Sequence, residues 1–324
     1  MRRYLGKRAI SALVCVLLVL IINFLIIRLA PGDPARLLVG TENPSAEQVR
    51  LITEKHGLDK PIYIQFARYL GNLLQGDLGV SYYTNEPVTG LILDKLGNTA
   101  ILSLTALALS VTLGTLGGIA CARRVGGKLD NLLSGICYFA DSFPSFWLGL
   151  MLMLVFAVKL DILPKHGMFN MRENYTGFQH MLDVMYHMIL PGITLTILQL
   201  PYFFRISRAA MIQTMGEDFI TTLRASGMPE RRIFRKYIFR NSILPTVTAI
   251  SIYMAYVVTG SALVEIVFSW PGMGSYIMTA ISRRDYPVLM GIYLMLSISV
   301  AVVMICVDLL YSVLDPRVSH TNRA

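Results

Sequence analysis

Six long apolar segments limit what this chain can fold into more than any other feature of its sequence. A helix needs about 20 mainly apolar residues to cross the hydrocarbon core of a bilayer. Six segments meet this requirement: Ile10–Leu29, Thr99–Cys121, Leu132–Val158, Met188–Ser207, Ser242–Val267 and Val288–Leu310. The third is the least regular, because Asp141 and Pro144 interrupt it. The pattern predicts an all-α integral membrane protein with six transmembrane helices.

Composition agrees with a lipid-embedded chain. Hydrophobic residues make up 54% of the 324 residues and charged residues 15%, against about a quarter charged in soluble domains. The first apolar segment is longer than the core of a secretory signal, and "RLAPGDPA" follows it without a small-residue cleavage site. We therefore expect this segment to remain in the protein as the first span.

Basic residues distinguish the two sides of the membrane, because short cytoplasmic loops carry an excess of Lys and Arg. With the N-terminus inside, most short-loop cations fall in the inner segments 1–9, 122–131, 208–241 and 311–324. The short outer loops hold only Lys159, Lys165, Arg172, Arg283 and Arg284. Both termini are therefore predicted to be cytoplasmic. The net charge of +9 follows this topology, so nucleic acid is not expected as a partner.

The segment 30–97 after the first span is predicted to be a helical extracytoplasmic loop. The stretch "NPSAEQVRLITEKHGL" opens with a capping-box pattern from Ser45 to Gln48. The stretch "KPIYIQFARYLGNLLQGDLG" follows, with Pro61 near a helix start. Its apolar face consists of Phe66, Tyr69, Leu70, Leu73 and Leu74. We expect this face to pack on the outer ends of the spans, because the loop is too small to form a core of its own.

The inner segment 208–241 is polar and is predicted to hold two amphipathic helices. The first runs from Glu217 to Ser226, Gly227 provides a left-handed stop, and Pro229 starts the second. The second helix has an apolar face of Ile233, Phe234, Tyr237 and Ile238 opposite Arg231, Arg232, Arg235 and Lys236. Two interpretations remain open, a basic anchor on anionic lipid headgroups and a bent protrusion that enters a groove of a partner.

Several stretches together resemble a known family. The stretch "EDFITTLRASGMPERRIFRKYIFRNSILP" is similar to the cytoplasmic loop by which permease subunits of binding-protein-dependent ABC importers dock on their ATPases. In chain order, the further matches are "RLAPGDPA", "HGLDKPIYIQFARYL", "GDLGVSY", "FSWPGMG", "RRDYP" and "LDPR". As a set they resemble the dipeptide, oligopeptide and nickel permease family, in the subunit with the long outer loop. The loop departs from the general pattern where Thr221 and Thr222 replace a glutamate and an alanine.

The resemblance implies a type I ABC importer permease fold (MetI-like) in the plasma (inner) membrane of a bacterium or archaeon. It divides the chain into an N-terminal segment with the first span, 1–29, the extracytoplasmic loop, 30–97, a five-helix permease core, 98–311, and a cytoplasmic tail, 312–324. The ATPase-docking loop lies at 208–241 within the core. Its implied docking residues are Glu217, Asp218, Phe219, Ile220, Thr221, Thr222, Leu223, Arg224, Ala225, Ser226, Gly227 and Pro229.

The resemblance also implies partners. These are a second homologous permease, two ABC ATPases that use ATP and magnesium, and an extracytoplasmic binding protein that delivers short peptides. Phe219, Ile220 and Leu223 would fill a cleft in the ATPase, and the two helices would act as a lever. Gly114, Gly117 and Gly118 would allow close approach of the second permease, or equally close packing within this chain.

The chain itself has no sequence motif for ATP hydrolysis. The nearest string to a phosphate loop, "VGGKLD", lacks the leading glycine and the hydroxyl residue that holds magnesium. We therefore expect no catalytic, cofactor or metal site in this subunit. Energy would have to come from the partner ATPases.

Two further places are candidates for function. Charges inside spans are costly, so Asp141 and the neighbouring Ser142 are candidates for the translocation path; the alternative is a carboxyl group satisfied by neighbouring helices. Glu265 is expected near the outer interface, solvated or capping a helix.

The second place is the outer turn "SWPGMGSYIMTAISRRDYP", a candidate outer gate or contact for the binding protein. Here Pro271, Gly272 and Gly274 should break regular structure before a short helix from Tyr276 to Ile281. The candidate residues are Trp270, Pro271, Gly272, Gly274, Arg283, Arg284 and Asp285, the last three in water. The alternative is an interfacial anchor with Trp270 and Tyr276 at headgroup level.

Other functions are weighed against the peptide permease. Import of nickel or a metal chelate is one, but His166, His180 and His187 match no compact ligand motif. An ion-gradient-driven carrier would need charged or broken helices in paired halves, and only Asp141 suggests that. A membrane enzyme would need a group of acid, base and metal residues that the sequence lacks.

Overall fold

The structure is a computed structural model that describes residues 2–29, 45–56, 59–257 and 261–314. This part of the chain is mostly helical, and its one β-bridge joins Val80 to Pro87. The chain divides into two compact units. Met1–Asn98 and Gly272–Ala324 form the first, called the terminal unit, and Thr99–Pro271 forms the second, called the central unit.

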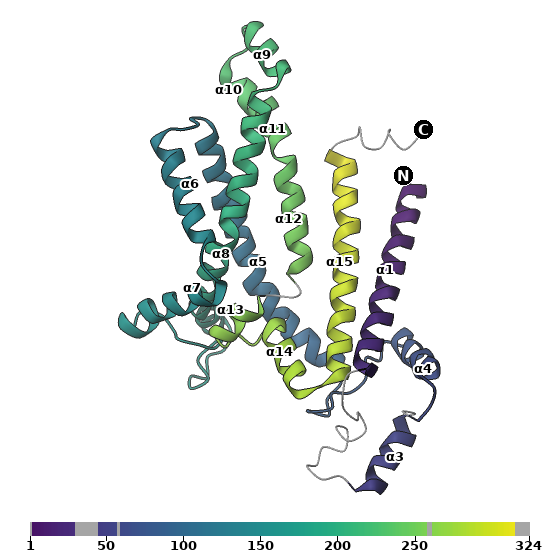
Figure 1. Ribbon diagram of the computed structural model, residues 1–324. Helices are drawn as coiled ribbons and strands as arrows, with labels where there is room; N and C mark the ends of the chain where they lie inside the picture. The colour runs from purple at the N-terminus through teal and green to yellow at the C-terminus, as the bar shows by residue number, and fades with distance from the viewer. Residues whose placement is uncertain (1, 30–44, 57–58, 258–260, 315–324) are drawn as a thin grey trace. The chain divides into compact units, whose positions relative to one another are not determined.

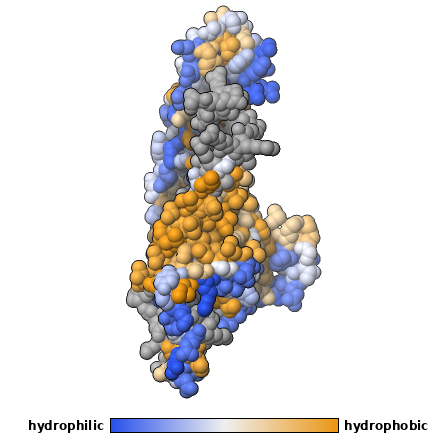
Figure 2. Space-filling view, turned by 90° about the vertical axis from the view of Figure 1, so that its right-hand side faces the viewer, coloured by the Kyte–Doolittle hydropathy of each residue, from blue (hydrophilic) through white to orange (hydrophobic). Residues whose placement is uncertain are grey.

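Two long apolar helices form the frame of the terminal unit. Helix α1 (Arg2–Leu29) packs side by side with α15 (Tyr286–Leu314), and the amino end of α1 lies beside the carboxyl end of α15 (Figure 1). Most large side chains of α1 between Ile10 and Ile26 are exposed, while Leu20 and Phe24 are buried. Hydrophobic side chains cover a broad band of the face shown in Figure 2, with a hydrophilic surface below it. Helices that are apolar on all sides are typical of membrane spans.

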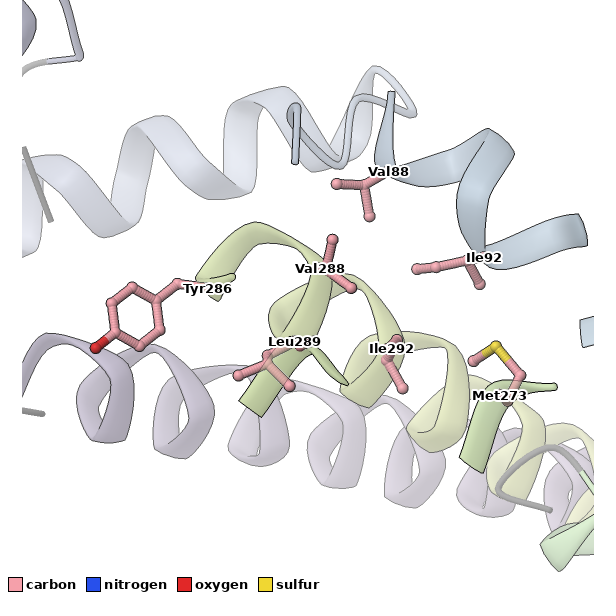
Figure 3. Packing of buried hydrophobic residues seen from close by; sticks show 8 residues of the cluster. Val88, Ile92, Met273, Tyr286, Val288, Leu289 and Ile292 are labelled. Atoms are coloured by element: carbon pink, nitrogen blue, oxygen red, sulfur yellow. The ribbon is translucent and has the colours of Figure 1, made fainter. Parts of the chain in front are cut away.

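The core of the terminal unit lies where three helices meet (Figure 3). It combines the first turns of α5 (Val88–Ala122), the helix α14 (Met273–Arg283) and the start of α15. The bare backbone of Gly291 makes this packing possible, because a Cβ atom there would lie 2.7 Å from Val88 and 2.8 Å from Ile92.

The predicted outer loop contains the two expected helices, α3 (Ala46–His56) and α4 (Ile62–Leu74). The capping box is confirmed, since the Gln48 amide donates to Ser45 Oγ and the Ser45 amide donates to Gln48 Oε1. Packing of α4 on a span is also confirmed, with the Phe24 ring of α1 5.1 Å from Phe66 and 6.0 Å from Tyr69. Burial raises the pKa of Tyr69 to about 12. Leu74, however, is exposed rather than part of the packed face.

The central unit contains the remaining helices. Helix α5 continues into it and is followed by α6 (Lys128–Asp141), α7 (Ser145–Leu152), the π-helical η1 (Met153–Lys159) and α8 (Phe178–Met215). After the loop that contains α9 to α11 come α12 (Leu244–Tyr256) and α13 (Ala262–Val267).

The prediction of an all-helical chain with several spans is confirmed, but two predicted spans are not single straight helices. Four described helices are long and apolar enough to cross a membrane, namely α1, α5, α8 and α15. The predicted third span is a pair, α6 with α7 and η1, bent by 103°. Pro144 explains the bend, because it cannot donate a backbone hydrogen bond and disfavours a helical conformation in Phe143. In the predicted fifth span, α12 ends at Tyr256 and α13 begins at Ala262 after the extended Ser261, while residues 258–260 lie outside the described part of the chain.

Gly114, Gly117 and Gly118 lie where α5 packs closely on α8. A Cβ atom on Gly114 would lie 2.8 Å from the Leu200 carbonyl oxygen, and one on Gly118 would lie 2.7 Å from the Phe204 carbonyl oxygen. Gly117 faces the Phe204 ring. The glycines therefore serve packing within this chain, which was one of the two predicted roles, the other being close approach of a second permease.

We predict that Gly118→Ala lowers the thermal midpoint of the purified protein, because overpacking a tight helix contact costs about 1–3 kcal/mol. Gly97→Ala on the same helix is the matched control, since nothing lies within 4 Å of its added Cβ atom. We expect this control to be neutral or slightly stabilising. Equal thermal midpoints for the two variants, measured in the same detergent, would contradict the packing described here.

Candidate functional site

The 208–241 loop folds as the predicted pair of helices with a fixed bend. It projects beyond the end of α8 and contains α9 (Asp218–Ala225), α10 (Glu230–Ile233), the π-helical η2 (Phe234–Ile238) and the start of α11 (Phe239–Ser242) (Figure 1). Gly227 makes the bend at φ +79°. The Gly227 amide donates to the Arg224 carbonyl, and the Met228 amide donates to the Leu223 carbonyl. Glycine adopts this left-handed conformation without strain, so the predicted stop is confirmed.

A small hydrophobic core holds the loop against the spans. Ile220, Ile233 and Ile238 are fully buried, together with Met211 of α8 and Ala122 of α5. The expectation that Ile220 enters a cleft in a partner is therefore wrong, because its side chain is already enclosed by this chain. Leu223 is half-buried in the same cluster, whereas Phe219 is 41% exposed. Only Phe219 of the three predicted cleft-filling residues offers a large apolar surface.

The exposed face of α9 is made of small and polar side chains. The exposed residues are Glu217, Asp218, Thr221, Thr222, Arg224, Ala225, Ser226, Gly227 and Pro229. An ion pair from Arg224 Nε to Glu230 Oε1, at 2.7 Å, links α9 to α10 across the bend. The loop thus presents a face of low relief, with Phe219 as its large apolar side chain.

The second half of the loop, from α10 to η2, exposes its basic side chains, Arg231, Arg232, Arg235 and Lys236. The predicted inward face is confirmed, since Ile233 and Ile238 are buried and Phe234 and Tyr237 pack against the same core. The Arg123 guanidinium lies 4.2 Å from the centre of the Phe234 ring. A shallow groove is lined by Arg235, Lys236, Phe239, Arg240 and Ile243.

A buried ion pair anchors the end of α8 to α6. Asp130, only 3% exposed, accepts two hydrogen bonds from the Arg208 guanidinium at 2.6 and 2.7 Å and one from the Gly126 amide at 2.8 Å. Bidentate pairs of this kind are among the stronger polar contacts. The sequence prediction missed this pair, although an isolated acid in a basic inner segment is a signal that points to it.

A second ion pair joins the same two helices. Arg205 Nη1 lies 2.5 Å from Asp141 Oδ2, and the two side chains are 37% and 45% exposed. Ser142 is exposed, and its hydroxyl donates to the Tyr138 carbonyl. The sequence prediction singled out Asp141 and Ser142 but overlooked Arg205, an arginine inside the predicted fourth span.

The outer turn and the neighbouring Glu265 differ from their predictions at four residues. Trp270 is fully buried in the core of the central unit, so its side chain can contact neither lipid headgroups nor a partner protein. Glu265 is also buried rather than solvated, and Thr99 Oγ1 donates to its Oε1 at 2.8 Å. Gly274 does not break the chain, because α14 begins at Met273 and runs past both ends of the predicted helix.

Asp285 was expected in water and is instead buried. It accepts hydrogen bonds from Ser81 Oγ at 2.5 Å and from the Tyr82 amide at 3.1 Å. Arg283 and Arg284 are exposed as predicted, and the Arg283 guanidinium lies 3.5 Å from the centre of the Tyr83 ring. This corner of the terminal unit therefore holds the turn around Ser81 in place.

A neighbouring tyrosine of α14 remains protonated. Burial, with smaller contributions from the negative charges of Asp285 and Glu86, raises the pKa of Tyr276 to about 12. Its hydroxyl group therefore stays neutral at physiological pH.

The histidines do not form a metal site in the described part of the chain. No group of three or more His, Cys, Asp or Glu residues is placed there to hold a metal ion. His187 pairs with Asp183 at 3.2 Å, and the His180 ring packs edge-on against Phe169.

The arrangement of helices is that of an ABC importer permease. It matches an inward-facing structure of the MetNI methionine ABC transporter with a TM-score of 0.53, covering 70% of this chain and 97% of that chain. Because the sequence identity is 18%, this likeness shows the fold alone.

Sequence comparison then gives the family. The family model "Binding-protein-dependent transport system inner membrane component" matches residues 114–320, and a model for the N-terminal part of such membrane components matches residues 1–105. The chain belongs to this family, as the resemblance predicted, and is a multi-pass component of the inner membrane.

Relatives match along nearly the whole chain. The oligopeptide transport system permease AppB of Bacillus subtilis is 32% identical, with 99% of this chain and 100% of the relative covered. The di/tripeptide permease DppB of Pseudomonas aeruginosa is 35% identical over 93% of this chain and 94% of its own length. The glutathione permease GsiC of Escherichia coli is 33% identical over 99% and 100%.

We predict that Asp285→Ala speeds chymotrypsin cleavage after Tyr82 and Tyr83 in the solubilised protein. The reason is that the Tyr82 amide and the Ser81 hydroxyl lose a buried acceptor, which costs about 1–3 kcal/mol for each unsatisfied group. Glu86→Ala, which removes an exposed carboxylate in the same turn, should cleave at the wild-type rate. The role given to Asp285 is wrong if the two variants cleave equally fast.

Proposed function

We propose that this chain is one of two permease subunits of an ABC importer and that its substrates are short peptides delivered by an extracytoplasmic binding protein. One observation carries the proposal: peptide permeases from three organisms align with nearly the whole chain at 32–35% identity. Nickel or chelate import and an ion-gradient-driven carrier have no comparable support in the sequence or in the described residues.

We propose a topology in which the 208–241 loop and both termini are cytoplasmic. The basic residues of the inner segments support it. The side-by-side placement of the amino end of α1 and the carboxyl end of α15 supports this proposal, because it would put both ends on one side of the membrane.

Coupling to the ATPases would run through the 208–241 loop. The loop is tied to two long helical runs, α8 before it and the nearly continuous series α10, η2, α11 and α12 after it, from Glu230 to Tyr256. At 1.5 Å per residue the second run is about 40 Å long, enough to carry a movement of the loop across a bilayer. Two partner ATPases, using ATP and magnesium, would move the loop as they close, and the paired permeases would switch their access from one side to the other.

The remaining candidates take different parts in this proposal. Asp141 and Ser142 would face the translocation path, since Asp141, the last residue of α6, and Ser142, directly after it, are both exposed. Arg283 and Arg284 would contact the binding protein, whereas buried Trp270 and Asp285 would support the surrounding structure. The second permease would not pack on Gly114 and Gly118, because α8 already covers them.

The direct test is ATP-driven uptake. The chain, reconstituted with its second permease, its ATPases and its binding protein, should import labelled dipeptides and tripeptides, and the same vesicles without ATPases should not. Uphill accumulation of a peptide by this chain without ATPases would overturn the proposal.

We predict that Gly227→Asp abolishes ATP-coupled peptide uptake while the protein still inserts in the membrane. A side chain at φ +79° is strained by about 1–2 kcal/mol, and the carboxylate would stand on the proposed contact face. Uptake per inserted protein is the measurement.

Gly76→Asp is the matched control for this variant. Gly76 has φ +78° and open space around it, and its amide donates to the Leu73 carbonyl as that of Gly227 donates to Arg224, but it lies in the predicted outer loop. The control should retain most of its uptake. Normal uptake by the Gly227 variant would remove the loop from the coupling mechanism.

A further inference from the structure

Two ion pairs join α6 to α8, and they differ in exposure. Asp130 and Arg208 are 3% and 27% exposed, as expected of a structural pair. Asp141 and Arg205 are 45% and 37% exposed. The second pair is therefore accessible from outside the chain, although both of its members lie within predicted spans.

By count along α6, the exposed pair lies well inside the predicted third span. Asp141 follows Asp130 by 11 residues, a rise of about 16 Å, which is about half of the ~30 Å hydrocarbon core. A charge at this depth faces water or a protein partner rather than lipid.

The two sides of α6 show which way the pair faces. An exposed apolar stripe at helical spacing consists of Leu129, Leu132, Ile136 and Phe139. Asp130, Ser134, Cys137 and Asp141 recur at helical spacing on the opposite side. The apolar stripe suits lipid, so Asp141 belongs to the polar side, which packs on α8.

Further polar side chains continue from Arg205 along α8. Tyr202 and Gln199 precede it at intervals of three, which makes them neighbours on the helix surface. The Tyr253 ring of α12 lies 5.3 Å from the Tyr202 ring. Gln199 and Tyr253 also line a pocket of about 80 Å³ together with Ser103 and Ser261. The ion pair thus stands at one end of a series of polar groups in the central unit.

We propose that Asp141 and Arg205 bind the two charged ends of a peptide in transit, Asp141 the terminal ammonium group and Arg205 the terminal carboxylate. This assignment rests on the proposed function and names the chemical feature of the substrate, free termini, that the permease itself recognises. A guanidinium group pairs with a carboxylate in a bidentate geometry, and a carboxylate accepts hydrogen bonds from an ammonium group.

Charge balance explains why a zwitterion fits this site. With no substrate the two side chains neutralise each other. A zwitterionic peptide exchanges partners with them and leaves the site neutral. A free metal cation would pair with Asp141 alone and leave Arg205 uncompensated, which is costly away from bulk water.

The geometry sets one requirement. A peptide spans about 3.3–3.6 Å per residue, so the pair, now in contact at 2.5 Å, has to open to admit a dipeptide or tripeptide. The long Arg205 side chain can make this movement by changing rotamers, and Asp141 is the last residue of α6, next to the bend.

The test measures equilibrium binding of tri-alanine to the complete importer in nanodiscs without the binding protein. The probes are radiolabelled tri-alanine, N-acetyl-tri-alanine and tri-alanine amide, and the variants are Asp141→Asn, Asp141→Glu, Arg205→Gln and, as a structural control, Asp130→Asn. In wild type we expect either blocked end to weaken binding at least tenfold.

The variants and the blocked ends should then combine in a specific, non-additive way. In Asp141→Asn, acetylation of the peptide should no longer weaken binding, whereas amidation still should. In Arg205→Gln, amidation should no longer weaken binding, whereas acetylation still should. Asp141→Glu and Asp130→Asn should keep both preferences. A merely structural pair would weaken binding of all three probes alike.

ATP-driven uptake of tri-alanine and of a mixture of dipeptides by the same wild-type preparation separates the two hypotheses. If uptake occurs, three binding results would each overturn the site alone. These are equal binding of blocked and free peptides, additive effects of the substitutions and the blocked ends on binding, and no saturable binding. No uptake of any short peptide would overturn the proposed function, and the site would fall with it.

Discussion

Every backbone amide and every charge inside a bilayer has to find its partner within the protein, because hydrocarbon offers none. This constraint accounts for the helical fold and also for its polar contacts. The chain places Glu265 against Thr99 in the central unit, Asp285 against Ser81 in the terminal unit, and two arginines of α8 against two aspartates of α6. The buried carboxylates of Asp130 and Glu265 therefore join helices, whereas buried Asp285 fixes the turn around Ser81.

The same constraint separates structural charges from functional ones. Asp130 is enclosed and hydrogen-bonded on several sides, which suits a fixed anchor for the end of α8. Asp141 is paired yet open, which suits a group that changes partners. A glycine contact between α5 and α8 keeps both helices close, so the 208–241 loop is carried by a firmly packed pair of helices.

Local signals made much of this predictable. The capping box at Ser45, the turn at Gly227 and the inward face of the second loop helix each depend on residues a few positions apart, and each was predicted correctly. The predictions failed for Ile220, Trp270 and Asp285 and for the solvated alternative at Glu265, because the surroundings of these residues come from distant parts of the chain. Asp285, for example, meets Ser81 across 204 residues of sequence.

The sequence by itself determined that the chain is helical with several apolar spans, and where the loop bends, because hydropathy and backbone preference are properties of neighbouring residues. Only the tertiary structure decided which polar side chains are enclosed and which remain open. The partners of Asp141 and Asp130 stand 64 and 78 residues further along the chain. No pattern of spacing shows which of two helices will bring such groups together, since that depends on how whole helices pack.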